Sequence, residues 1–184
     1  MYITLLLACQ LEPLFAGELE FVQKESTHVS AWSSTIIQRY HGPQDSDAIY
    51  LDLSLVEKNG ARRVLATNII GPIVLFEEEK KILSCEDNGI VTGIKPIIFD
   101  LNGRKKEGPQ HPGHLRECER IERSSLLLLH YNLVKDGKPY NFIRILDTDG
   151  KVVLEKESHS AEEIVVSYEG KMYRVRVPQP DWPG

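Results

Sequence analysis

Residues 98–105 read IFDLNGRK, and residues 145–152 read ILDTDGKV. Each stretch is an apolar run that ends in an aspartate, enters an Asn-Gly or Asp-Gly pair and leaves it with a basic residue. Such pairs tolerate positive φ and are among the strongest two-residue hairpin signals. Gly103 and Gly150 are 47 residues apart, and Gly60, in another Asn-Gly pair, precedes Gly103 by 43 residues. Periods of about 40–50 residues with several strands per unit are typical of propeller blades.

The rest of the chain also consists of short alternating or apolar runs separated by turn signals. Ile49, Leu51, Leu53 and Leu55 fall on one face of a half-buried strand, because they recur with a period of two. Similar runs cover residues 73–76, 82–84, 97–100, 126–131, 141–146, 152–154, 164–168 and 172–177. We therefore predict an all-β fold of repeated antiparallel hairpins, arranged as propeller-like or meander sheets. The alternative is a β-sandwich or a small open barrel, because hairpins in any β protein share these turns.

Helical patterns are few in this sequence. Residues 115–123 carry charges at helical spacing with three apolar positions, and they form either one short helix or a polar edge strand. Residues 26–37 are a second helical candidate. Residues 103–114 are the longest stretch without a strand pattern, and loops of that length in a compact domain are usually functional or disordered.

The length of 184 residues fits one domain with a sizeable core. Residues 1–17 resemble a secretory signal peptide, because the apolar run 3–9 precedes small residues at Ala16 and Gly17, although no basic residue precedes that run. We expect a single all-β domain over residues 18–184, periplasmic or secreted. If the first segment is instead a strand, the protein is cytoplasmic. No apolar run reaches the roughly 18 residues of a membrane span.

The cysteine count favours export. Removal of the signal-like segment takes Cys9 away and leaves one pair, Cys85 and Cys118. In an exported domain this pair forms a disulfide, which closes a loop of about 34 residues and adds roughly 3–4 kcal/mol to the free energy of unfolding. In the cytosol the same two residues are unrelated free thiols. Their spacing fits no zinc motif.

The known patterns of catalytic and metal-binding residues are missing from the sequence. His111 and His114 could bind zinc together with Glu117, but the Pro-Gly pair between the histidines makes a turn and not a helix face. Residues 147–150 resemble the start of a calcium loop, and a hairpin turn explains them fully. Neither a G-x-S-x-G nucleophile motif nor a Gly-rich phosphate loop occurs. We predict that the protein is not an enzyme and holds no metal or other cofactor.

A binding function is the remaining expectation. The net charge of −5 argues against nucleic acid as the partner, because phosphate binding needs a basic surface. In a β domain without catalytic residues the loops carry the function, and the sheets hold them in place. The long polar segment 103–125, tethered by Cys118, is the first candidate for contact with a protein partner. The candidate partner-binding residues are Arg104, Lys105, His111, His114, Ser124 and Ser125.

The signal-like N-terminus, the acidic β-rich body, the lone cysteine pair and the lack of catalytic residues are together similar to bacterial periplasmic immunity proteins, which neutralise toxins delivered by type VI secretion. This resemblance rests on general character and transfers no functional residue. It implies that a loop occludes the active site of a toxin enzyme, with Ser124, Ser125 or His114 meeting the catalytic groups. Two other functions stay open: a structural or assembly module of the cell envelope, and a small-ligand-binding β-barrel.

Overall fold

The computed structural model describes residues 20–42, 50–69, 72–87, 94–110 and 114–182. Almost every regular element in this part of the chain is a β-strand, and the exception is a 3₁₀ turn at Ser30–Trp32. The prediction of an all-β fold is therefore confirmed. Among the same residues, no helix is long and apolar enough to cross a membrane. The signal-like segment 1–17 lies outside the described residues.

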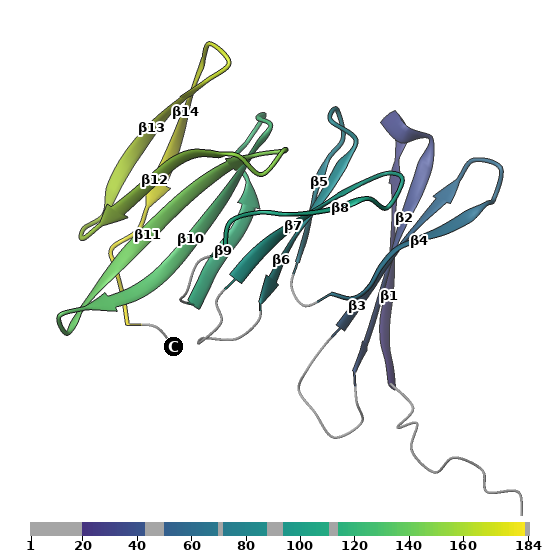
Figure 1. Ribbon diagram of the computed structural model, residues 1–184, viewed down its shortest axis with the longest axis horizontal. Helices are drawn as coiled ribbons and strands as arrows, with labels where there is room; N and C mark the ends of the chain where they lie inside the picture. Colours follow the sequence, from purple (N-terminus) through teal and green to yellow (C-terminus); the bar gives the residue numbers. More distant parts are fainter. Residues whose placement is uncertain (1–19, 43–49, 70–71, 88–93, 111–113, 183–184) are drawn as a thin grey trace, which may run out of the picture.

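The strands form four antiparallel sheets, each built from strands that are consecutive in the chain. Sheet A contains β1 (Glu20–Val29), β2 (Ser34–Gly42), β3 (Tyr50–Glu57) and β4 (Arg62–Ile69). Sheet B contains β5 (Ile73–Phe76), β6 (Lys81–Asp87), β7 (Ile94–Asp100) and β8 (Lys105–Glu107). Sheet C contains β9 (His114–Arg120), β10 (Leu126–Lys135), β11 (Lys138–Asp147) and β12 (Val152–Ser158), and sheet D contains β13 (Glu162–Tyr168) and β14 (Lys171–Val177). Figure 1 shows the sheets side by side in one row, which is the arrangement of propeller blades.

The repeated glycines lie at equivalent places in successive sheets. Gly60, Gly103 and Gly150 each follow the third strand of their sheet, with φ angles of 83°, 79° and 75°. Positive φ at such a turn favours glycine, since a Cβ atom clashes there. The spacing of these glycines in the sequence is therefore the length of one four-stranded sheet.

The aspartates of the two matching sequences make the same hydrogen bonds in their turns. The Asp100 carboxylate accepts hydrogen bonds from the backbone N–H groups of Asn102 and Arg104 at 2.8 and 2.9 Å. Asp147 accepts the corresponding pair of backbone hydrogen bonds, again at 2.8 and 2.9 Å. Burial opposes ionisation of Asp100, but the two backbone donors prevail and lower its pKa. The aspartate thus closes the turn that the glycine permits.

Three apolar layers fill the spaces between the four sheets. In β6, Ile82 packs between sheets A and B, whereas its neighbour Leu83 packs between sheets B and C. In β10, Leu127 faces sheet B and Leu128 faces sheet D. Strands that are buried on both faces need apolar side chains at consecutive positions. This explains why Leu126–Leu129 form a continuous apolar run and not an alternating one.

The expected disulfide joins sheets B and C. Cys85 in β6 is bonded to Cys118 in β9, with their Cα atoms 6.5 Å apart. The Cys85 side chain is buried in the apolar layer between the two sheets, and Cys118 packs against the same layer. The covalent bond therefore fixes two neighbouring sheets to one another.

One expectation about local structure is wrong, and one open alternative is settled. Residues 26–37 are not helical, because most of them pair as β1 and β2, where Val29 and Ile36 point into the core and charged or polar positions alternate with them. Residues 115–123 form β9 and a following turn, which settles the choice between a helix and a strand. Part of the stretch 103–114 is also regular, since β8 pairs with β7. The separate four-stranded sheets exclude the sandwich and barrel alternatives for the described residues.

Candidate functional site

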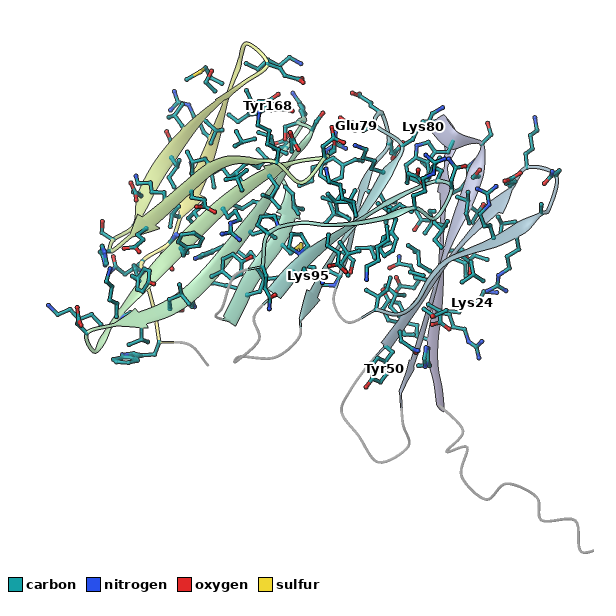
Figure 2. The ribbon with its side chains drawn as sticks, viewed as in Figure 1. Lys24, Tyr50, Glu79, Lys80, Lys95 and Tyr168 are labelled. Carbon is teal, nitrogen blue, oxygen red and sulfur yellow. A yellow bond between two sulfur atoms is a disulfide. The ribbon has the colours of Figure 1, made fainter. Side chains whose placement is uncertain are left out.

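One edge of the row of sheets collects the turns that join the first to the second strand and the third to the fourth strand of each sheet. Because neighbouring strands are antiparallel, alternate connections of a sheet lie on the same edge. Figure 1 shows these turns on the upper side, and Figure 2 shows Glu79 and Lys80 on that side, with Tyr168 near the β13–β14 turn. We call this edge the turn face. It contains residues 30–33, 58–61, 77–80, 101–104, 121–125, 148–151 and 169–170.

Hydrogen bonds link the turns of neighbouring sheets. The Trp32 indole Nε1 of sheet A donates to the Glu77 carbonyl of sheet B at 2.6 Å. The Ser125 hydroxyl of sheet C donates to the Glu79 carboxylate of sheet B. These bonds pin sheets A, B and C to each other at the turn face. They hold the turns of these three sheets to one another, and fixed turns lower the entropy that binding a partner costs.

A groove opens on the turn face where sheets C and D meet. Its volume is about 570 Å³, and we call it the C–D groove. Three acidic side chains, three basic side chains, two serines and one tyrosine line it. They are Glu78, Glu122, Glu169, Arg120, Arg123, Lys171, Ser124, Ser125 and Tyr173. The β5–β6, β9–β10 and β13–β14 turns all contribute, so residues far apart in the sequence form one polar site.

The β9–β10 turn forms one wall of the groove. Ser124 is 3% exposed; its hydroxyl donates to the Ile121 carbonyl at 2.7 Å and accepts from the Leu126 N–H at 3.1 Å. Arg120 Nε donates to the Ser124 carbonyl at 2.7 Å. Arg123 is the middle residue of this turn. Its backbone has a φ of 56°, and its side chain is 90% exposed. Ser124 therefore shapes the turn, while Arg123 extends from it into solvent.

The chemistry of this lining suits recognition by charge. Carboxylates and guanidinium or ammonium groups stand close together, and they can pair with opposite charges on a polypeptide. The Ser124 hydroxyl is committed to two backbone groups, and the described residues that line the groove include no histidine that could act as a general base for it. No group of three or more His, Cys, Asp or Glu residues that could hold a metal ion occurs in the described part of the chain.

The candidate residues from the sequence fall in two separate places. Ser124 and Ser125 lie at the C–D groove. Arg104 and Lys105 lie at the β7–β8 turn of sheet B, where their side chains are 85% and 46% exposed. His114 starts β9 and pairs with Asn132, but its side chain, like the whole of His111, lies outside the described structure.

Sequence reasoning missed most of the groove. Glu78 comes from sheet B, and Glu169, Lys171 and Tyr173 come from sheet D. Each lies in or near a turn. Nearness to a turn is the one feature of the sequence that could have identified them as candidates. The turn equivalent to the β9–β10 turn in each neighbouring sheet was the place to search, once the 43- and 47-residue periods had been noticed.

A second polar cluster holds the C-terminal residues against the opposite edge of sheet C. His130, 1% exposed, has Nδ1 3.3 Å from a Glu117 carboxylate oxygen and Nε2 2.9 Å from Asn141 Oδ1. Asn141 Nδ2 donates to the Pro178 carbonyl at 2.8 Å. Asp181 accepts hydrogen bonds from Asn132 and Arg116, both at 2.7 Å. The chain therefore turns back beneath sheet C after β14.

Rows of consecutive four-stranded antiparallel sheets define the class of the fold as propeller-like. No family model matches the chain, and no curated protein matches it in sequence. Solved structures do match. The acylaminoacyl peptidase of Pyrococcus horikoshii is similar with a TM-score of 0.54 and 12% identity, over 80% of this chain and 31% of the peptidase.

A second similar structure is the β-propeller domain of the Trilobed protease from Pyrococcus furiosus, which has an open velcro topology. The TM-score is 0.54 at 15% identity, over 88% of this chain and 58% of that one. The chain thus spans about a third of the length of the first peptidase, 31%, and little more than half of the propeller domain. Identities this low show the fold alone. The resemblance to immunity proteins is not tested by these structures and stays a prediction.

Proposed function

We propose that this chain is an exported, non-enzymatic binding module that recognises a polypeptide partner through the C–D groove. The observation that carries the proposal is the groove itself, where turns from sheets B, C and D bring six charged side chains of both signs around about 570 Å³. Polypeptides carry charged side chains of both signs, and paired charges on a rigid surface give specificity. The proteases with similar propellers act on polypeptides by their names, which supports the same class of ligand here.

Export is part of the proposal. The disulfide between Cys85 and Cys118 supports it, because structural disulfides persist in oxidising compartments and are rare in the cytosol. Inhibition of a toxin enzyme is the specific form of binding that the immunity resemblance implies. In that form the partner's active site would lie over the turn face, with the exposed Arg123 reaching into it. Ser124 would support the turn from behind, since its hydroxyl is used within the chain.

Selection from a displayed library of random 12-residue peptides tests the proposal. We expect enriched peptides whose affinity falls by about tenfold or more in the Arg123→Glu/Glu169→Lys variant, since two groove charges outside β14 are reversed. The matched control is Lys135→Glu/Lys138→Glu, which reverses two charges at the β10–β11 turn away from the groove. Failure to enrich any peptide, or equal loss of binding in the groove variant and the control, would contradict a groove that recognises polypeptides.

A further inference from the structure

Sheet D differs from the other sheets in the number of its strands. Sheets A, B and C each have four strands, and sheet D has two, β13 and β14. In the complete sheets a third strand pairs with the second; no strand among the described residues pairs with the outer edge of β14. About half of the backbone N–H and C=O groups of an edge strand point away from its one neighbour. β14 therefore offers an unpaired hydrogen-bonding edge seven residues long.

The chain itself moves away from this edge. After Val177 the Pro178 carbonyl is bound by Asn141, and Asp181 is bound by Arg116 and Asn132, all in sheet C. The residues that follow β14 are thus held beneath sheet C through Asp181. Within the part of the chain that the structure describes, none of them takes the position of a third strand in sheet D.

Apolar side chains of sheet C are only half covered opposite this open position. In sheet A the outer strand β4 buries Leu65 to 7% exposure, because sheet B has four strands to cover it. The equivalent outer strand of sheet C is β12. There Val153 and Leu154, which face sheet D, are only partly buried. A strand added to β14 would lie where those side chains lack cover.

The charges of β14 identify the kind of strand that fits. β14 carries Lys171, Arg174 and Arg176 and no acidic residue. Arg176, and Arg174 with its ion-pair partner Glu163 of β13, lie on the face away from sheet C. Val175 and Val177 face sheet C and are buried. A second copy of β14 would set two basic strands side by side, and like charges on adjacent strands are destabilising. A strand with acidic residues outward and apolar residues inward complements both faces.

We infer that an extended polypeptide segment, with acidic and apolar residues in alternation, pairs with the outer edge of β14 and completes sheet D. This inference deepens the proposed function, on which it rests, by naming the form and charge of the polypeptide. Main-chain hydrogen bonds to β14 give affinity, and alternate side chains give specificity. Acidic side chains lie beside Arg174 and Arg176, and apolar side chains pack toward Leu154 of β12.

The test uses a fluorescein-labelled peptide of alternating glutamate and valine flanked by threonines, and the same peptide with lysine in place of glutamate. Fluorescence anisotropy measures affinity, and hydrogen–deuterium exchange measures protection of residues 171–177. We expect the acidic peptide to bind at least about tenfold more tightly than the basic one and to slow exchange of those amides. In the Arg174→Glu/Arg176→Glu variant the preference reverses. Lys135→Glu/Lys138→Glu, at the β10–β11 turn of sheet C, is the matched control and leaves binding unchanged.

Two results would overturn edge pairing: unchanged exchange of residues 171–177 under saturating acidic peptide, or equal affinity of that peptide for the wild type and Arg174→Glu/Arg176→Glu. Thermal melting confirms that each variant is folded. If library peptides bind the C–D groove while the β14 amides stay unprotected, edge pairing is wrong and the proposed function stands. If the acidic peptide protects β14 and no library peptide depends on the groove, the groove is wrong and edge pairing stands.

Discussion

β10 and β14 are both the second strand of their sheet, yet they are buried very differently. In β10 every side chain from Leu126 to Tyr131 is buried, since sheet B covers one face and sheet D the other. In β14 only Val175 and Val177 are buried, both against sheet C. The position of a strand within its sheet therefore does not decide its burial. The number of neighbouring sheets decides it.

The sequences of β10 and β14 account for this difference in burial. β10 begins with LLLLHY, a continuous run that suits two covered faces. β14 reads KMYRVRV, in which apolar and basic residues alternate, and this pattern suits one covered face. The uncovered face of sheet D carries Glu163 and Arg174 as an ion pair at 2.7 Å and the exposed side chain of Met172. The charged side chains on that face favour contact with water. Only the backbone edge of β14 presents hydrogen-bonding groups that another strand could pair.

The largest expected effect comes from truncating one buried and one exposed side chain in these two strands. Leu129→Ala in β10 should lower the free energy of unfolding by about 2–5 kcal/mol, because Leu129 is 0% exposed and the substitution leaves a cavity between sheets B and C. Met172→Ala in β14 should change it by no more than about 0.5 kcal/mol, because Met172 is 66% exposed. Urea denaturation of both variants measures the two values. Similar losses would mean that sheet D is covered in solution.

An intermediate effect follows from the disulfide, which joins sheets B and C and has no described counterpart between sheets C and D. Cys85→Ala/Cys118→Ala should lower the free energy of unfolding by roughly 3 kcal/mol, since the bond closes a loop with a sequence separation of 33 residues. Reductant should shift the urea midpoint of the wild type and leave that of the variant unchanged. A wild-type midpoint that is insensitive to reductant would contradict a stabilising disulfide.

The sequence predicted the strands and their period because both are local. Gly103 and Gly150 mark turns whose geometry depends on a few neighbouring residues, and the alternation of β3 and β14 is visible along each strand. The error at residues 26–37 has a local cause too, since the Ser-Ala-Trp 3₁₀ turn at its centre resembles a helical segment. Local sequence could not distinguish a row of blades from a sandwich. That difference depends on which sheet covers which face, and the contacting residues are far apart in the sequence.

The candidate site was harder to predict for the same reason. Ser124 and Ser125 were candidates because they end the polar segment 103–125, but their neighbours Glu169 and Tyr173 come from a hairpin more than forty residues later. Arg104 and Lys105 were grouped with the serines on the basis of sequence proximity, and the structure places them in sheet B, at the β7–β8 turn. Grouping by equivalent turns, and not by segments, would have separated the two sets.

The smallest expected effect concerns the ionic contact between sheets C and D. The Lys156 ammonium group of β12 bonds the Glu162 carboxylate of β13, and this bond, helped by Ser158, lowers the pKa of Glu162. A carboxyl with a lowered pKa in the folded state stabilises the fold above its ordinary pKa, and that stabilisation is lost as the pH falls through the lowered value. Glu162→Gln should therefore be less stable than the wild type at neutral pH, and the difference should vanish under acid conditions.

Urea midpoints of the wild type and Glu162→Gln, measured from pH 7 down to about pH 3, follow this difference. Glu163→Gln is the matched control, because the Glu163 carboxylate pairs with Arg174 within sheet D. If sheet D is attached to sheet C by the Lys156–Glu162 contact as well as by apolar packing, hydrogen exchange in β13 and β14 should rise in Glu162→Gln and stay unchanged in Glu163→Gln. Equal exchange in both variants would mean that Ile164, Val166 and their apolar neighbours hold the half-sheet alone, and the open edge of β14 would then be positioned entirely by packing.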